Sequence, residues 1–439
     1  MHSIWSEFSH PPREPLRGHV KCDVLVIGGG MAGLLCAYQL KQAGVDCVVA
    51  EAARIGSGIT ANTTAKITSQ HGLIYHKLAQ KFGMETAGRY LQANEQALAG
   101  FRKLCREIPC DFEAQSSYVY SLSSRAELEA ELRVLQQLRF PAAARDEIPL
   151  PFPTLGAVEF PEQAQFHPLR FLAAIAADLK IFENTPIRRI AEGNAIADTG
   201  TIHPKAIIVA THFPFLNRHG SYFLKLYQQR SYVLALKNAD FPSGMYRDAA
   251  QKGLSFRHYG DTLLLGGGGH RTGKSGGSWP ELEAVAGAYF PGAQFTHHWA
   301  AQDCMTLDGM PYIGRYSART PDLYVATGFN KWGMTGSMAA AQILTDQLLG
   351  RSNPCGKLFS PSRSMLRPQL AANMLESTWN LLTPTRPRCP HLGCALKWNP
   401  QEHSWDCPCH GSRFAADGTL LDNPATGDSC SIKKSSSKE

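Results

Sequence analysis

The sequence predicts a chain of mixed α/β and α+β class. In it, a Rossmann-like dinucleotide-binding domain carries an inserted antiparallel sheet, and a small all-β subdomain follows. Three observations predict this: a glycine-rich turn joins a strand to a helix near the N-terminus, strands separated by turns recur in residues 229–265, and paired cysteines and histidines gather after residue 388. With 439 residues, 44% of them hydrophobic and 18% charged, the chain is long enough for two or three domains with a sizeable core.

The N-terminal turn has the full context of a dinucleotide site. A strand at residues 23–27 leads into Gly28, Gly30 and Gly33, and a helical stretch and a second strand ending at Glu51 follow. The first glycine permits a tight turn, the second lets the backbone approach a pyrophosphate at the helix N-terminus, and the third allows close packing of helix on strand. Glu51 can accept both hydroxyls of an adenosine ribose. These residues alone leave FAD and NAD open.

Two C-terminal loops each offer one cysteine and one histidine to a metal site. Two cysteines on one iron and two neutral imidazoles on the other are the ligands of a Rieske [2Fe–2S] cluster. A zinc site is the alternative, because two cysteines and two histidines also satisfy that ion. Against zinc, the Cys-x-His spacing is tight for one tetrahedral ion, and a second cysteine pair has no use there. We therefore predict as cluster ligands Cys389, His391, Cys407 and His410.

This C-terminal segment resembles the cluster-binding part of Rieske proteins of the cytochrome bc type, which carry the same extra cysteine pair. We expect Cys394 and Cys409, one in each loop, to form a disulfide. Phe414 stands where that type has a tyrosine whose hydroxyl bonds a cysteine sulfur. Ser412 can still donate, but the missing donor predicts a lower potential. Pro424 resembles the loop that covers the cluster, and no supporting base domain is recognisable, so the subdomain is expected to lean on the rest of the chain.

Residues 20–350 resemble the D-amino-acid-oxidase-like family of FAD enzymes, alongside sarcosine and glycine oxidases. The matching segments occur in the family's order: a loop beneath the flavin at 54–66, a strand at 206–211, residues 306–314, and a last strand and helix at 322–336. In the family, that helix points its N-terminus at the flavin, where its dipole stabilises negative charge on the reduced ring, and we expect the same here. The resemblance implies FAD and predicts as its contacts Gly28, Gly30, Met31, Ala32, Gly33, Glu51, Ala52, Arg54, Ser57, Thr60, Thr63, Thr64, Ala65, Ala210, Thr211, Asp308, Gly328, Gly333, Met334 and Thr335.

The whole arrangement resembles bacterial FAD-dependent oxidoreductases fused to a C-terminal Rieske domain. The resemblance implies an oxidoreductase at 1–352, with a flavin part at 20–80, 155–215 and 300–352 and a substrate part at 81–154 and 216–299, then a connector at 353–384, a Rieske subdomain at 385–430 and a tail at 431–439. Periodicity predicts helices within 84–138 and at 369–382, and strands at 229–236, 254–258 and 262–265. The glycines at 266–269 predict a mobile loop or a close approach of backbones.

Members of the flavin family oxidise carbon–nitrogen bonds by hydride transfer, and no universal catalytic base can be carried over. The catalytic residue is therefore unknown, and Lys66, in the loop below the flavin, is a candidate without a definite role. Cys304 lies where sarcosine oxidases carry a flavin-linked cysteine, but its spacing differs, so noncovalent FAD is expected. Other candidates, among which an arginine could bind a carboxylate bidentately, are Arg230, Tyr232, Arg257, His258 and His270.

The leading hypothesis is a dehydrogenase that takes two electrons from an amine or amino acid and passes them singly through the cluster to an unidentified acceptor. An oxygen-using oxidase with a peripheral cluster and a non-enzymatic redox-sensing protein are the alternatives. A ring-hydroxylating oxygenase is disfavoured, since no two-His-one-carboxylate motif is recognisable.

Charge and cysteine usage bear on partners and compartment. The formal charge of +7 is scattered, which favours a solvated basic surface over nucleic-acid binding. No apolar run predicts a leader or a membrane span. Cysteines outside the cluster region show no disulfide framework, so we expect a reducing compartment, the cytoplasm.

Overall fold

The computed structural model describes residues 2–384 and 387–432, and an eight-stranded, mostly parallel sheet runs through this part of the chain in the order β16-β17-β10-β1-β2-β7, with β9 and β8 continuing from β10. Apolar side chains of β1 at Val24, Leu25, Val26 and Ile27 are buried in an unbroken run, as expected for a parallel strand covered on both faces. The strands are β1 (Gly18–Ile27), β2 (Cys47–Ala50), β7 (Lys180–Phe182), β8 (Ile187–Ala191), β9 (Asn194–Ala197), β10 (Gly200–Val209), β16 (Tyr312–Arg315) and β17 (Leu323–Thr327).

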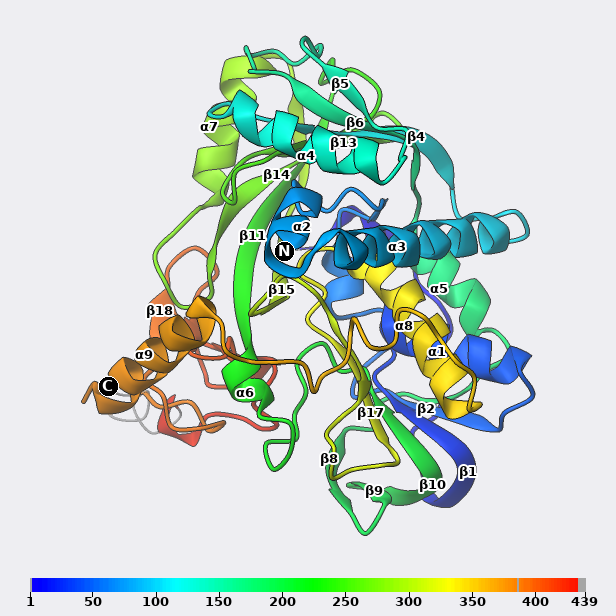
Figure 1. Cartoon of the computed structure of the whole chain (residues 1–439). Helices are drawn as coiled ribbons and strands as arrows, with labels where there is room; N and C mark the ends of the chain where they lie inside the picture. Colours follow the sequence, from blue (N-terminus) through cyan, green and yellow to red (C-terminus); the bar gives the residue numbers. More distant parts are fainter. Residues whose placement is uncertain (1, 385–386, 433–439) are drawn as a thin grey trace.

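Helices pack beside this sheet, and Figure 1 shows α1, α3 and α8 stacked together on it. Their apolar side chains form one core cluster with β1 and β2. The helices are α1 (Met31–Gln42), α2 (Tyr75–Phe82), α3 (Met84–Cys105), α4 (Arg125–Gln137), α5 (Pro168–Ala176), α6 (Tyr222–Lys225), α7 (Trp279–Tyr289), α8 (Gly333–Leu348) and α9 (Pro368–Leu382), with short 3₁₀ turns η1 (Ile4–Glu7) and η2 (Ile59–Asn62). Among the described residues, no helix is long and apolar enough to cross a membrane.

A second, largely antiparallel sheet of nine strands crosses the described residues in the order β15-β11-β14-β13-β12-β4-β6-β3, with β5 beside β6. Its strands are β3 (Lys66–Ile67), β4 (Glu113–Tyr120), β5 (Ala143–Arg145), β6 (Ala157–Gln165), β11 (Leu226–Lys237), β12 (Met245–Asp248), β13 (Ser255–Tyr259), β14 (Thr262–Arg271) and β15 (Gln294–Thr306).

Two sequence expectations differ from this sheet, and a third is met in one of its two alternatives. Strand β4 interrupts the residues 84–138 that were expected to be helical. Strand β6 and the end of β15 come from segments expected in the flavin part, yet they pair within the second sheet. The glycines at 266–269 belong to β14 instead of a mobile loop. The expected close approach of backbones does occur there, because a Cβ on Gly268 would lie 3.0 Å from the Cα of Gly277.

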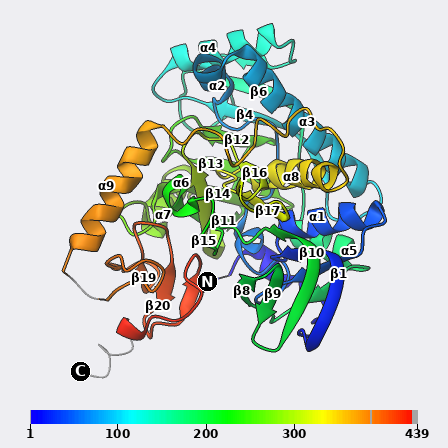
Figure 2. The ribbon, with the colours of Figure 1, turned by 60° about the horizontal axis from the view of Figure 1, so that its bottom comes forward.

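Residues 387–432 fold into a four-stranded antiparallel sheet in chain order. Helix α9, predicted at 369–382, precedes it and lies along its side in both views (Figures 1 and 2). The strands are β18 (Lys397–Asn399), β19 (Ser404–Asp406), β20 (Arg413–Ala415) and β21 (Leu420–Asp422). The tail from residue 433 lies outside the described residues. The domain limits given above stay a prediction.

Candidate flavin and cluster sites

The predicted dinucleotide turn has no room for side chains. Gly28 has φ +112°, and a Cβ on it would lie 2.5 Å from the carbonyl oxygen of Ala210. A Cβ on Gly33 would lie 1.9 Å from the carbonyl oxygen of Gly28, so helix α1 and strand β1 touch backbone to backbone. Gly30 caps α1, and Gly30, Met31 and Ala32 line the adjoining cavity, where the N–H of Met31 donates to Oγ1 of Thr60 at 3.2 Å. Such an end suits a pyrophosphate.

A cavity of about 830 Å³ extends from this turn to the second sheet and to the cluster subdomain. It collects most of the predicted contacts, namely Gly28, Gly30, Met31, Ala32, Glu51, Ala52, Arg54, Ser57, Thr60, Thr63, Thr64, Ala210, Thr211, Gly333 and Met334. The residues Gly33, Ala65, Asp308, Gly328 and Thr335 do not line it. Gly33 supports the turn from behind, and Thr335 donates instead to the carbonyl oxygen of Thr68.

Glu51 and Arg54 are held at the cavity wall by hydrogen bonds. The Glu51 carboxylate accepts the N–H groups of Gly29 at 2.6 Å and Ala53 at 2.9 Å, while burial raises its pKa. Arg54 pairs with the buried Glu183 at 2.7 Å. Glu183 also accepts the N–H of Ile55 at 2.8 Å. Glu183 could not be predicted from the sequence, because nothing in a single sequence links it to a loop more than a hundred residues earlier.

Asp308 is a structural residue away from the cavity. Its carboxylate accepts two hydrogen bonds from Arg363, at 2.6 and 2.8 Å, and the aspartate side chain is 2% exposed. The family resemblance placed Asp308 among the flavin contacts. Here the connector supplies an arginine that occupies both of its oxygens.

The cavity end that faces the second sheet is rich in cationic side chains. Lys66 lies there, and its Nζ donates to the carbonyl oxygen of Tyr246 at 3.1 Å. Burial lowers the pKa of Lys66 well below its usual value, and nearby Arg247 lowers it further. Burial also lowers the pKa of Lys331 to about 8, although Asp303 opposes that shift. The sequence analysis did not single out Arg247, Lys331 or Asp303, which carry no motif.

Four of the other substrate candidates have structural roles instead. Arg230 pairs with Glu402 of the cluster subdomain. Arg257 donates to the carbonyl oxygens of Thr64 and Ala65 at 2.8 and 2.9 Å and is absent from the cavity wall. His258 binds the carbonyl oxygen of Phe241, and His270 that of Gly268. Of the five substrate candidates named from the sequence, Arg230 and Tyr232 line the cavity.

Cys304 is 2% exposed, and its Sγ lies 3.8 Å from Oγ1 of Thr327. It does not line the cavity, although the neighbouring Gln302 and Asp303 do. This geometry agrees with a buried structural cysteine.

The two predicted histidine ligands face one another, with ring centroids 4.9 Å apart. Nδ1 of His391 and Nδ1 of His410 are both buried and have no hydrogen-bond partner among the described residues. Nε2 of His391 donates to Oδ1 of Asn217 at 2.9 Å, which leaves Nδ1 as the unprotonated nitrogen. Each imidazole therefore has a lone pair that suits a metal.

The predicted cysteine ligands lie beside the histidines and are buried. Cys389 is 2% exposed and Cys407 is 1% exposed. Hydrogen bonding from Cys389, and then from Cys394 and Cys409, holds the pKa of Cys407 well below the usual thiol value. A thiolate is the form that binds metal. The thiols of Cys389 and Cys407 lie within hydrogen-bonding reach of one another, and the half-buried His391 adjoins the buried His410. This pairing of two thiols and two imidazoles fits an iron–sulfur cluster.

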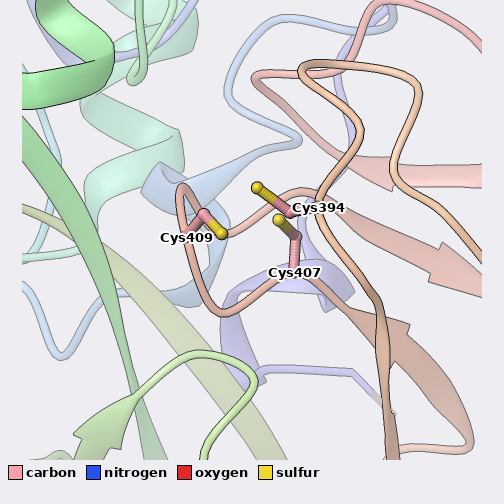
Figure 3. Close-up of side chains that lie close together, drawn as sticks. All are labelled: Cys394, Cys407 and Cys409. Atoms are coloured by element: carbon pink, nitrogen blue, oxygen red, sulfur yellow. The ribbon is translucent and has the colours of Figure 1, made fainter. Parts of the chain in front are cut away.

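The second cysteine pair adjoins the same point. Figure 3 shows the side chains of Cys394, Cys407 and Cys409 converging, and their sulfur atoms lie within 4.8 Å of one another. Cys394 and Cys409 are free thiols in this structure. Their disulfide therefore stays a prediction.

The cluster loops dock on the wall of the large cavity. Nε2 of Gln302 donates to the carbonyl oxygen of Gly411 at 2.9 Å, and Nε2 of Gln228 donates to that of His410 at 2.9 Å. Oε1 of Gln228 bonds His212, a cavity residue, at 3.2 Å. Side chains of the flavin half thus support the cluster loops. Cluster-subdomain residues that line the cavity are Glu402, Arg413, Leu420, Leu421, Asp422, Asn423, Ala425 and Thr426.

Comparison with known proteins settles the family. The family described as "FAD dependent oxidoreductase" matches residues 23–347, which is more than half of the chain. The chain belongs to the FAD-dependent oxidoreductase family. The Rieske [2Fe-2S] domain matches residues 380–434, which favours the iron–sulfur cluster over zinc. FAD and a Rieske-type cluster are therefore the cofactors of this oxidoreductase, and the fold class predicted from its sequence is confirmed.

Relatives share either the whole oxidoreductase or its fold. The Rieske 2Fe-2S iron-sulfur protein YhfW of Bacillus subtilis (strain 168) is 32% identical over 96% of each chain. The L-proline dehydrogenase from P. horikoshii superposes with a TM-score of 0.67 at 18% identity, covering 79% of this chain and 98% of that one. The glycine oxidase from Geobacillus kaustophilus gives 0.65 at 19% identity, with 79% and 99% covered. These two likenesses show the flavoenzyme fold.

Proposed function

We propose that this FAD-dependent oxidoreductase oxidises the carbon–nitrogen bond of an amine or amino acid and delivers the electrons one at a time, through its cluster, to an acceptor. The observation that carries the proposal is the shared wall: cluster-subdomain residues 420–426 line the same cavity as the dinucleotide turn. When bound, FAD would accept a hydride, and the cluster would carry single electrons.

Arg247 is the side chain best suited to bind a substrate carboxylate. It lines the cavity with its guanidinium carbon 5.3 Å from the Trp332 ring, and within residues 2–384 and 387–432 it forms no ion pair. An arginine can bind a carboxylate through two parallel hydrogen bonds. Amino-acid substrates are also consistent with the names of the proline dehydrogenase and glycine oxidase that share this fold.

Lys66 is our candidate for accepting the proton of the substrate amine. Hydride transfer needs that amine in its neutral form, and burial lowers the pKa of Lys66 well below its usual value, which favours the neutral, proton-accepting form of this lysine. Across the cavity, the N-terminus of α8 at Gly333 and Met334 presents free N–H groups. Its dipole would stabilise negative charge on the reduced flavin.

One aromatic side chain, Phe213, lies beside both histidine ligands of the cluster site. Phe213, two residues after the cavity residue Thr211, has its ring centroid 6.4 Å from those of both His391 and His410. The histidine side of the cluster site therefore faces the flavin half. This orientation supports entry of electrons from the flavin.

An anaerobic reduction experiment tests the proposal. Purified protein is mixed without oxygen with glycine, N-methylglycine, L-proline and putrescine in turn, and absorbance and EPR spectra are recorded. We expect one class of substrate to bleach the flavin and then produce the EPR signal of a reduced Rieske cluster. A bleached flavin with a cluster that stays oxidised, together with stoichiometric peroxide in air, would refute the relay in favour of the oxidase alternative. A flavin left oxidised by every amine, yet reduced by dithionite, would refute the substrate class.

A further inference from the structure

Helix α9 has the opposite polarity to an ordinary surface helix. Its inward face carries Asn373 and Asn380, which are 2% and 1% exposed. Oδ1 of Asn373 accepts a hydrogen bond from Arg271 at 2.9 Å, and its Nδ2 donates to the carbonyl oxygen of Leu224 at 3.2 Å. A surface helix usually turns its apolar side inward. Here polar contacts anchor the helix, and the apolar side faces outward.

The outward face of α9 is a continuous apolar surface. Leu375, Trp379 and Leu382 are 73, 72 and 77% exposed and follow one another at helical spacing. Both views place the helix at the outer edge of the molecule (Figures 1 and 2). Exposed apolar neighbours extend the surface, namely Leu366, Met374, Leu381 and Leu392. Contiguous exposed apolar patches of this kind mark interaction sites.

The charges of α9 favour a protein over a lipid surface. Glu376 is the one charged residue in the helix, and it pairs with Lys274 at 2.7 Å. Helices that lie on membranes carry many lysines and arginines beside their apolar face. Interfaces between identical subunits are instead depleted of charge at their centres.

The pattern of side chains on this face is self-complementary. Ala371, Leu375, Thr378 and Leu382 are spaced by four, three and four residues, which is the seam of two packed helices. If a two-fold axis passes beside Leu375, two antiparallel copies of α9 place Trp379 of one copy over Ala371 of the other. A large side chain then meets a small one on both sides of the axis, as an isologous interface requires.

We propose that two copies of this chain associate through the apolar faces of α9, antiparallel about Leu375. The helix has 15 residues and is about 22 Å long, so it offers less than the roughly 800 Å² per partner of a standard interface. The dimer is therefore weak and dissociates on dilution. It covers Trp379 and the exposed Leu382, at the end of α9 that packs against the cluster loop.

Sedimentation velocity of the full-length holoprotein tests the proposal over a dilution series. We expect the wild type to shift from monomer to dimer as its concentration rises, and Leu375→Asp to stay monomeric throughout. Leu122→Asp is the matched control, because Leu122 is 51% exposed outside α9, and its behaviour should follow the wild type. Flavin and cluster absorbance show that each variant has folded.

A cross-linking experiment tests the axis independently. Because Leu375 would face its own copy, Leu375→Cys should yield a dimer linked by a disulfide when diamide takes two electrons and two protons from the two thiols and is itself reduced to the hydrazine. Leu122→Cys should give no more cross-link than the wild type. A wild type that is monomeric at every concentration would overturn the proposal, and so would a monomer that binds phosphatidylglycerol vesicles through Trp379.

Discussion

Arg230 of β11 and Glu402 of the turn between β18 and β19 form a buried ion pair that joins the flavin half to the cluster subdomain. Their side chains are 4% and 6% exposed, and Nε of Arg230 donates to Oε1 of Glu402 at 3.0 Å. Arg413 donates to Oε2 of Glu402 at 2.7 Å. One carboxylate thus serves two guanidinium groups, one from each side of the interface.

Removing the Glu402 carboxylate should loosen the cluster subdomain. In Glu402→Gln, two buried arginines lose a shared partner, and breaking a buried pair costs about 3–5 kcal/mol. We expect cluster absorbance to be lost at a lower denaturant concentration than the one that releases the flavin, which is followed by the change in flavin fluorescence. Asp146→Asn is the control, because its pair with Arg125 is exposed and worth less than about 1 kcal/mol. If the cluster were lost and the flavin released at the same denaturant concentration, as expected for the wild type, the prediction would be contradicted.

Gly33→Ala should abolish flavin binding. The added Cβ would lie 1.9 Å from the carbonyl oxygen of Gly28, so helix α1 must move away from the turn. Overpacking of this kind costs on the order of 1–3 kcal/mol or more, and it displaces the N–H groups that face the cavity. The flavin-to-protein ratio after purification measures the effect. Gly287→Ala, in α7 with open space at its Cβ, should retain the full ratio.

Two substitutions should move the cluster potential in opposite directions. Oγ of Ser412 lies within hydrogen-bonding reach of the Cys389 thiol, so Ser412→Ala removes a donor and should lower the potential. Phe414 is fully buried in the same apolar cluster as Cys389 and Cys407, and Phe414→Tyr should raise the potential. EPR-monitored redox titration measures both. Equal potentials in the wild type and in the two variants would show that neither the Ser412 hydroxyl nor the introduced tyrosine hydroxyl donates to a cluster sulfur.

Arg247→Met should weaken the binding of substrates that carry a carboxylate. Loss of a charge-assisted hydrogen bond costs about 1.5–3 kcal/mol, so KM should rise by roughly 10- to 100-fold. An amine without a carboxylate serves as the control substrate, and its KM should change little. Equal effects on both substrates would assign Arg247 to the flavin or to the fold.

His71 should make stability depend on acid pH. Burial lowers its pKa from 6.5 to about 3, so only the unfolded chain takes up a proton between these values. Stability is then complete above pH 6.5 and falls with pH by about 1.4 kcal/mol per unit, or about 2 kcal/mol by about pH 5. Urea unfolding at several pH values should show a smaller slope in His71→Gln. The exposed His219→Gln should match the wild type.

The sequence by itself determined the parts of this protein whose chemistry needs residues close together in the chain. The glycine turn at 28–33 and the loops around His391 and His410 were recognisable because strand, turn and ligand spacing are local. Only the tertiary structure decided which distant side chains complete the sites. Arg230 was expected to bind substrate, yet Glu402, far along the chain, takes its charge. Asp308 was expected to contact flavin, yet Arg363 takes its oxygens.

The cluster subdomain shows the same difference between ligands that are close together in the sequence and supporting residues that are far away in it. The ligands could be predicted from the sequence, but the support of the cluster loops comes from Gln228, Gln302 and Arg271 on strands of the flavin half, which the sequence did not indicate. Such hydrogen bonds join backbone carbonyls to side chains with no characteristic spacing. A single sequence does not record them, because they form only once the two halves pack and bury polar groups that must find partners.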